Sequence, residues 1–225
     1  MTTSTTTDQK PQTDWAEMGR QLRHPQGEEG IKIGLGMNEA NMGMIRRMFE
    51  LINLTAGQHV LEIGPGNAVH VKEILSARPG VQYTGVEISE TMLNEAAQNC
   101  RATMNVSFLL VDGKSLPFAD EAFDRVVSSN TIYFWENPSE YAREISRVLK
   151  KGDGMVCLAF VAKSFMEKLP FTREGFDLYD EQEVKTLLAG AGLEPVSSLR
   201  ETETVRTNTG VLVERDRYFV LAKKV

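Results

Sequence analysis

The fold is decided by the stretch His59-Val60-Leu61-Glu62-Ile63-Gly64-Pro65-Gly66-Asn67-Ala68-Val69-His70. Its apolar first part stops at glycine and proline, which is typical of a short buried strand over His59–Ile63. A helical pattern of apolar residues begins soon afterwards. Between the two, Gly64 and Gly66 allow a tight turn and a close approach of the backbone to a ligand, because glycine has no Cβ. The stretch therefore predicts the strand, turn and helix at which an open α/β sheet binds a nucleotide-like cofactor.

The same stretch indicates which kind of cofactor is bound. A dinucleotide site needs the pattern G-x-G-x-x-G, but Val69 occupies the place of the third glycine. A phosphate-binding loop needs Gly-Lys followed by Ser or Thr, which this turn lacks. Glu62 stands directly before the turn, where its carboxylate suits a cationic ligand better than a pyrophosphate. A cationic cofactor is therefore favoured over a dinucleotide.

A second acidic residue follows at the end of the next strand. We expect that strand over Val81–Val86, and Glu87 follows it about 20 residues beyond the glycines, where a carboxylate can accept hydrogen bonds from both hydroxyls of a ribose. Ser89 is expected to cap the following helix. A third strand over Val106–Val111 leads into Asp112, which either contacts a ligand or serves as an ordinary Asp-Gly turn residue.

The rest of the chain continues the alternation of strands and helices. The expected elements are strands over Phe123–Ser129 and Met155–Val161, a helix capped by Asn137, an irregular insert over Lys163–Tyr179, a helix capped by Asp180 and Glu183, and two last strands over Glu194–Thr204 and Tyr218–Lys224 joined by a turn at Asn208-Thr209-Gly210.

The N-terminal region is expected to have three parts. Residues 1–13 are rich in threonine and are predicted to form a disordered tail. A short amphipathic helix is expected over Asp14–Gln26 and a longer one over Met37–Leu54. The glycines of Gly27–Gly36 predict a flexible connection between these helices.

Composition limits the possible partners. The chain has 225 residues, 41% of them hydrophobic and 25% charged, which fits one globular α/β domain. Its net charge of -6 argues against nucleic acid or an anionic membrane as partner. No apolar run is long enough to span a membrane, and no signal-peptide pattern is present, so we expect a cytoplasmic protein. The two cysteines are expected to be reduced core residues, and no metal site is expected.

These motifs together resemble a known family. Val-Leu-Glu-Ile-Gly-Pro-Gly-Asn at 60–67 is similar to motif I of the class I S-adenosylmethionine (SAM) methyltransferases. Later motifs of that family resemble Gly85-Val86-Glu87-Ile88-Ser89, Asp112 with Leu116-Pro117-Phe118, and the block from Arg143 to Gly154. The likeness runs from about residue 54 to residue 192. It is greatest to the small-molecule branch that includes the ubiquinone and menaquinone C-methyltransferases.

The resemblance implies a fold, a cofactor and a set of binding residues. The fold would be a Rossmann-like, mostly parallel seven-stranded sheet with helices on both faces and an antiparallel last strand. The domain would cover residues 57–225, with residues 14–56 as a helical lid over the cofactor cleft. SAM would be the cofactor and S-adenosylhomocysteine (SAH) the product. The implied cofactor-binding residues are Glu62, Gly64, Pro65, Gly66, Glu87, Ile88, Met92, Asp112, Gly113 and Asn130.

The resemblance leaves the acceptor open. It implies methyl transfer to an organic small molecule by in-line displacement, for which a base helps only if the acceptor must lose a proton. The candidate catalytic residues are His70, on the first turn of the helix after the glycines, and Tyr133, beyond the fourth strand. Either could instead be a packing residue, an alternative that is favoured for His70. The oligomeric state stays open.

Two other functions remain alternatives. A non-catalytic SAM-binding regulator or partner subunit would carry the same cofactor motifs without turnover. A nicotinamide oxidoreductase is a weaker alternative, because the third glycine of a dinucleotide site is missing.

Overall fold

A seven-stranded sheet forms the centre of the molecule, with the strand order β3-β2-β1-β4-β5-β7-β6. The computed structural model describes residues 14–206 and 211–225. The strands are β1 His59–Ile63, β2 Gln82–Glu87, β3 Val106–Leu110, β4 Arg125–Ser129, β5 Met155–Val161, β6 Leu193–Arg206 and β7 Leu212–Lys224. Strands β1 to β5 pair in parallel, and β7 runs antiparallel to both β5 and β6. The predicted mostly parallel sheet with an antiparallel end is thereby confirmed.

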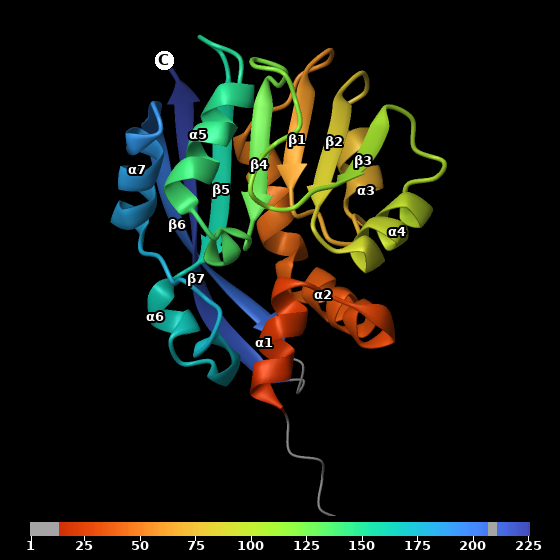
Figure 1. Cartoon of the computed structure of the whole chain (residues 1–225), viewed down its shortest axis with the longest axis vertical. Coiled ribbons are helices and arrows are strands. Elements are labelled where there is room, and N and C mark those ends of the chain that lie inside the picture. The colour runs from red at the N-terminus through yellow and green to blue at the C-terminus, as the bar shows by residue number, and fades with distance from the viewer. Residues whose placement is uncertain (1–13, 207–210) are drawn as a thin grey trace, which may run out of the picture.

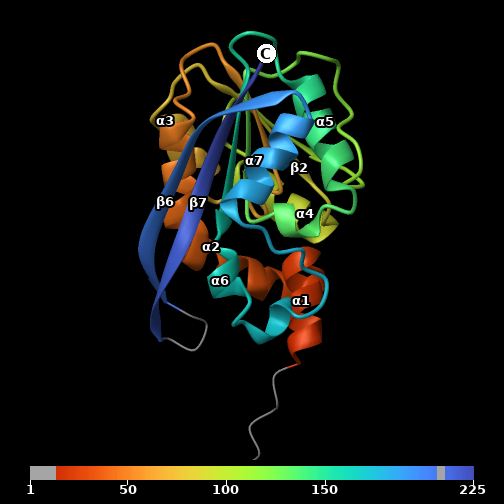
Figure 2. The ribbon, with the colours of Figure 1, turned by 90° about the vertical axis from the view of Figure 1, so that its left-hand side faces the viewer.

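Helices cover both faces of this sheet (Figures 1 and 2). Their bounds are α1 Trp15–Arg23, α2 Gly27–Leu51, α3 Val71–Ser76, α4 Glu90–Asn99, α5 Pro138–Val148, α6 Lys163–Met166 and α7 Glu181–Gly190, with single turns of 3-10 helix at η1 Ile132–Phe134 and η2 Pro170–Thr172. The second half of α2 and α3 pack on one face, and α5 and α7 pack on the other. This arrangement confirms the Rossmann-like layering expected from the resemblance.

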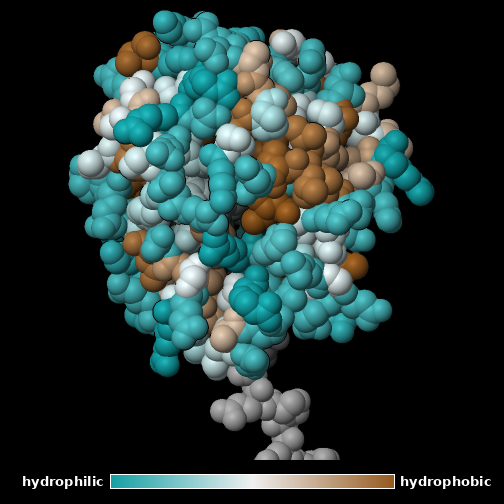
Figure 3. All heavy atoms as spheres, viewed as in Figure 1, coloured by the Kyte–Doolittle hydropathy of each residue, from teal (hydrophilic) through white to brown (hydrophobic). Residues whose placement is uncertain are grey.

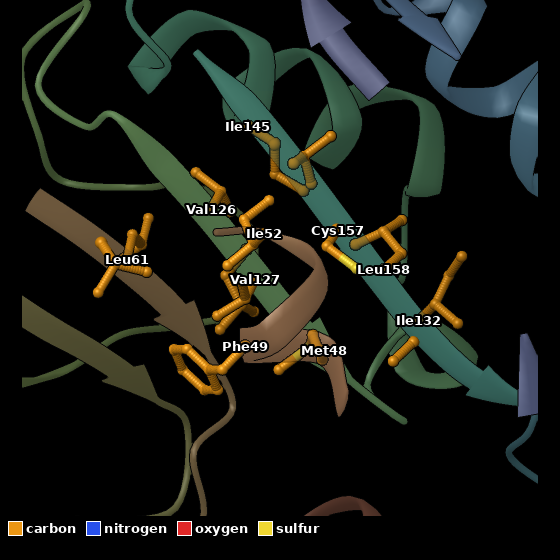
Figure 4. Close-up of a cluster of buried hydrophobic side chains, with 14 of the residues drawn as sticks. Met48, Phe49, Ile52, Leu61, Val126, Val127, Ile132, Ile145, Cys157 and Leu158 are labelled. Carbon is orange, nitrogen blue, oxygen red and sulfur yellow. The ribbon is translucent and has the colours of Figure 1, made fainter. Parts of the chain in front are cut away.

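The core lies on both sides of the central strands. Figure 4 shows side chains of α2, β1, β4, β5 and α5 meeting there, with Phe49 and Val127 near its middle. These residues are fully buried, as is the thiol of Cys157. Burial raises the pKa of that thiol well above its usual value. Both cysteines are free and buried, as expected.

The glycine-rich segment 27–36 is a helix, so the prediction of a flexible connection was wrong. Helix α2 runs without interruption from Gly27 to Leu51. A Cβ on Gly30 would lie 2.7 Å from the carbonyl carbon of Pro25, and one on Gly34 would lie 2.9 Å from Sδ of Met92. The glycines therefore serve close packing of α2 against its neighbours. Sequence reasoning took them as flexibility because it could not see those neighbours.

Helix α1 and the first half of α2 lie at the edge of the sheet where the parallel strands end. In Figure 1 they are the red and orange helices below the arrowheads of β1 and β4. An open α/β sheet binds its ligands at this edge. The N-terminal helices are therefore placed beside the predicted cofactor cleft.

The last two strands are longer than predicted. Strand β7 pairs with β5 only over Arg217–Lys223, whereas its pairing with β6 continues out to Arg206 and Leu212. The outer parts of β6 and β7 therefore form a two-stranded ribbon that extends past the sheet beside α2 (Figure 2). The predicted turn at 208–210 and the predicted tail at 1–13 lie outside the described residues.

Three shorter segments match their predictions to different degrees. The insert 163–179 is less irregular than expected, because it contains α6 and η2. The capping box of Asp180 and Glu183 at the start of α7 is confirmed. Asn137 stands at the N-cap of α5 but makes no side-chain capping bond there.

On the face that α5 and α7 cover, the part over β1–β3 is covered by a loop instead of a helix. Within the described part of the chain, the connection from β3 to β4 has no helix. Hydrophobic side chains gather on this face over β1–β3 (Figure 3), and Leu109 and Leu110 of β3 are 40% and 47% exposed. None of the helices described here is long and apolar enough to cross a lipid bilayer.

The packing of α2 leads to a stability prediction. Gly30→Ala should lower the free energy of unfolding by about 1–2 kcal/mol, because the overpacking cost of about 1–3 kcal/mol exceeds the helix-propensity gain of up to about 1 kcal/mol. Gly190→Ala is the matched control, since a Cβ there would meet no atom within 4 Å. Chemical denaturation of both variants checks this. A Gly30→Ala protein as stable as the control would show that the helix has room there.

Candidate functional site

The carboxylate of Glu87 organises the predicted cofactor site. It ends β2, is 6% exposed, and accepts hydrogen bonds from three backbone N–H groups. Oε2 accepts from N of Gly66 at 3.0 Å, and Oε1 accepts from N of Ile88 at 2.9 Å and N of Ser89 at 3.0 Å. Burial raises the pKa of this carboxyl, and the three N–H donors oppose that shift. The glycine turn after β1 and the turn after β2 are thus held together by one side chain.

The glycine turn leaves room for a ligand. Gly64 and Gly66 both have left-handed backbones, with φ of 69° and 58°. A Cβ on Gly64 would lie 2.5 Å from Cγ2 of Thr131, so the turn packs closely on the end of β4. A Cβ on Gly66 would meet no atom within 4 Å. The open space therefore lies at Gly66, directly beside the Glu87 carboxylate.

The second buried carboxylate, Glu62, is bonded inside the protein. Its Oε2 accepts from the hydroxyl of Tyr83 at 2.6 Å and from Nε2 of His70 at 2.8 Å. All three side chains are almost fully buried behind the glycine turn. Burial, and next to it the charge of Glu62, raises the pKa of the Tyr83 hydroxyl. The structure thus gives His70 a carboxylate partner that its place in the sequence did not reveal.

Asp112 and Gly113 form a turn on the far side of Glu87. Oδ1 of Asp112 accepts from N of Lys114 at 2.8 Å and from N of Ser115 at 3.3 Å, and these bonds lower the pKa of its carboxyl. A Cβ on Gly113 would lie 3.2 Å from Cγ2 of Ile88. Asp112 therefore has the geometry of a turn residue and is also exposed beside the turn after β2. Asp112 can therefore stabilise this turn and still contact a ligand.

The N-terminal helices contact this site directly. Nε2 of His24 donates to the carbonyl of Ile88 at 3.0 Å, and the hydroxyl of Ser89 donates to the carbonyl of Pro25. N of Gly27 donates to Oγ1 of Thr91 at 3.2 Å. Met92 is 1% exposed and lies under Gly34 of α2. Sequence reasoning missed His24, whose contact with Ile88 spans 64 positions of the chain.

Polar side chains also gather at the carboxyl end of β4, beside the predicted cofactor site. Asn130 has a left-handed backbone with φ of 57°. Its Oδ1 accepts from the hydroxyl of Tyr133 at 3.2 Å and from N of Val161 at 3.3 Å, and its Nδ2 donates to Oδ1 of Asn41 at 3.2 Å. The single proton of the Tyr133 hydroxyl is shared between Oδ1 of Asn130 and the carbonyl of Val161, and burial raises the pKa of this hydroxyl well above its usual value. Asn41, from α2, is another residue of this edge that sequence reasoning missed.

One side chain of the glycine turn has an unused acceptor. Asn67 is 3% exposed, and its Oδ1 is buried without a hydrogen-bond partner among the described residues. A buried polar atom without a partner is uncommon in proteins. It fits a site whose ligand supplies a donor. Pro65, the remaining predicted residue, is buried in the same turn.

A surface hollow of about 530 Å³ lies elsewhere, between α5 and α7. None of the predicted cofactor residues lines it. The functional site is therefore assigned from the hydrogen bonds and the open space at Gly66.

Comparisons with known proteins agree with this assignment. Residues 61–158 match a family described as methyltransferase domain. The demethylmenaquinone methyltransferase of Tropheryma whipplei is 31% identical over 115 residues, which are 51% of this chain and 47% of that protein. The chain thus aligns with only about half the length of this curated relative.

Solved structures share the fold. A SAM-dependent methyltransferase of Aquifex aeolicus superposes with a TM-score of 0.64 at 19% identity, over 95% of this chain and all of that one. The [4+2]-cyclase SpnF superposes with a TM-score of 0.62 at 20% identity, over 79% of this chain and 80% of that one. At such identities the likeness concerns the fold alone. Residues 61–158 of this chain thus match the methyltransferase-domain family, and the chain shares the fold of these solved structures.

Proposed function

We propose that the protein transfers a methyl group from SAM to an organic small molecule by in-line displacement. The observation that carries this proposal is the open space at Gly66 beside the buried carboxylate of Glu87. The two features lie at the carboxyl ends of neighbouring parallel strands, where open α/β sheets bind nucleotide-like ligands.

The residues present fit the adenosine part of SAM. Glu87 would accept hydrogen bonds from the ribose hydroxyls, and Ile88 and Gly113 would lie against the adenine, with Asp112 near its amino group. An ionised carboxylate offers about four acceptor positions, of which the three backbone donors use most. Binding of both hydroxyls therefore requires the N–H of Gly66 to give up or share its bond with Glu87.

The other half of the cofactor would lie along the glycine turn. SAM, when bound, supplies a methyl group on a positively charged sulfur and the leaving group for the displacement. The buried negative charge of Glu62 behind the turn would favour a cation in front of it. Asn67 and Asn130 would supply polar groups on either side of this part of the cleft.

His70 and Tyr133 remain candidate catalytic residues within this proposal. Each is bonded inside the protein, His70 to Glu62 and the Tyr133 hydroxyl to the backbone of Val161. Either would have to exchange an internal hydrogen bond for one to the acceptor before it could remove a proton. An acceptor that is already ionised would need neither.

We also propose that α1 and the first half of α2 form a lid over the cofactor. The contacts of His24, Pro25 and Gly27 with the turn after β2 and the start of α4 would have to open for ligand entry and would exclude water after closure. In this proposal residues 14–56 are the lid region and residues 57–225 the catalytic domain.

A non-catalytic SAM-binding protein is the second candidate. The specific observation in its favour is that both candidate catalytic residues, His70 and Tyr133, are buried and bonded inside the protein. Both candidates need cofactor binding, and only methyl transfer to an acceptor separates them.

The proposal predicts a cofactor preference. SAH should bind more tightly than NAD, because Val69 stands where a dinucleotide site needs glycine. Glu87→Ala should weaken SAH binding by about 1.5–3 kcal/mol, or roughly 10- to 100-fold, the range for hydrogen bonds to a charged group. Isothermal calorimetry measures both. Glu140→Ala, an exposed position on the first turn of α5, is the control and should bind SAH as the wild type does. Tighter binding of NAD would contradict the assignment of the cofactor.

A pH dependence follows from the raised pKa of Glu87. SAH affinity should fall as the pH is lowered through this pKa, which lies above the usual glutamate value of about 4.3, because the protonated carboxyl accepts fewer hydrogen bonds. The free protein should respond in the opposite direction. A raised folded-state pKa means that this group's contribution to the free energy of unfolding declines as the pH rises through that pKa.

Glu87→Gln tests both effects. This variant should bind SAH weakly and should lack both pH-dependent components. Calorimetry and denaturation across the same pH range provide the measurements. A wild-type SAH affinity that stays constant down to the usual glutamate pKa would remove Glu87 from the ribose site.

A further inference from the structure

A cluster of buried charges joins the C-terminal ribbon to α2. In it, Glu203 of β6 pairs with Arg215 and Arg217 of β7, and Glu201 pairs with Arg217 and with Arg47 of α2. The side chains of Glu203, Arg215 and Arg217 are only 10–11% exposed. Such burial makes each unpaired charge costly.

Arg215 connects this cluster to the edge of the sheet. Its Nε donates to Oε1 of Glu203 at 2.9 Å, and its Nη2 donates to the carbonyl of Ala40 at 2.7 Å and to Oδ1 of Asn41 at 3.2 Å. Oδ1 of Asn41 also accepts from Nδ2 of Asn130. The positive charge of Arg215 acts on the Tyr133 hydroxyl, opposing the rise of its pKa. The guanidinium therefore lies beside the ends of β4 and β5, next to the predicted site of methyl transfer.

The cluster is balanced in charge but unevenly buried. Its three arginines pair with three glutamates, namely Arg47, Arg215 and Arg217 with Glu50, Glu201 and Glu203. Arg47 and Glu50 lie at its exposed end, with 35% and 58% of their side chains exposed, so solvent screens that pair. Arg215 and Glu203 lie at its buried end.

Within the described ranges, two nitrogen atoms of these arginines also make no hydrogen bond. Nε of Arg217 is buried and has no hydrogen-bond partner among the described residues. Nη1 of Arg215 makes none of the hydrogen bonds found in the described ranges, because Nε and Nη2 make all of them. A guanidinium that keeps one side unused can bind a further planar anion. Nη1 of Arg215 is therefore the donor available to a ligand beside Asn41.

We propose that the methyl acceptor carries a carboxylate, which Arg215 binds together with the side-chain amides of Asn41 and Asn130. This inference rests on the proposed function and names the class of acceptor. A carboxylate is ionised at neutral pH, so it can pair with the guanidinium of Arg215 without loss of a proton in the site. The rings of Phe134 and Phe176, whose centroids lie 4.7 Å apart, are only partly buried and offer an apolar surface for the remainder of the acceptor.

The test compares carboxylates with amides of the same shape. Acetate and acetamide, benzoate and benzamide, and octanoate and octanamide are titrated into the full-length protein saturated with SAH. We expect the carboxylate to bind at least about tenfold more tightly than its amide in one or more pairs, the effect of a hydrogen bond to a charged group.

Three variants separate recognition from a structural role. Arg215→Gln should abolish the preference for carboxylates, whereas Glu203→Gln should increase carboxylate affinity, because it removes the anion that competes for Arg215. A purely structural cluster would lose affinity in both variants. Arg200→Gln is the matched control, since Arg200 lies on the same ribbon, pairs with Asp216 and is 62% exposed. It should keep the preference.

The outcomes distinguish this inference from the proposed function. Failure of SAH to bind would refute the proposed function. SAH binding without a carboxylate preference in any pair, or a preference that survives in folded Arg215→Gln, would overturn the inference alone. If Arg215→Gln does not fold, Arg215→Lys serves in its place. This variant keeps the charge but loses the planar fork, so a preference reduced below the wild-type value supports the proposal and an unchanged preference overturns it.

Discussion

The structure of the site depends on one buried carboxylate and its backbone donors. A carboxylate removed from water is stable only when hydrogen bonds replace its hydration. Glu87 obtains them from the N–H groups of Gly66, Ile88 and Ser89. This single requirement fixes the glycine turn against the turn after β2 and places the space at Gly66 beside a strong acceptor. The proposed ligand site is thus preorganised by the same bonds that stabilise its two turns.

A second constraint is the close packing of α2. Its glycines bring the helix against Pro25 and Met92, and its Asn41 lies between Asn130 of the sheet and Arg215 of the ribbon. Three distant segments of the chain therefore meet at the ends of β4 and β5. Movement of α2 would change the cofactor side and the acceptor side of the cleft together. The proposed lid is in this sense also part of the proposed acceptor site.

The sequence predicted the parts of this arrangement that depend on local pattern. The bounds of β1 and β5 agree residue for residue with the prediction, because buried parallel strands are continuous apolar runs that end at recognisable turns. The glycines of α2 were misread, because their function depends on neighbours and not on spacing. The contact between Asn41 and Arg215 could not be predicted from the sequence, since 174 positions separate the two residues. Sequence spacing could place His70 near the cofactor loop but could not show its bond to Glu62.

We propose that Glu87 exchanges part of its backbone bonding for the ribose of SAM. The most direct measurement is a crystal structure of the protein with SAH bound. We expect both ribose hydroxyls within hydrogen-bonding distance of the Glu87 carboxylate, a longer distance from its Oε2 to N of Gly66, and the adenine between Ile88 and Gly113. A complex in which Glu87 keeps all three backbone bonds and SAH lies away from it would contradict the account.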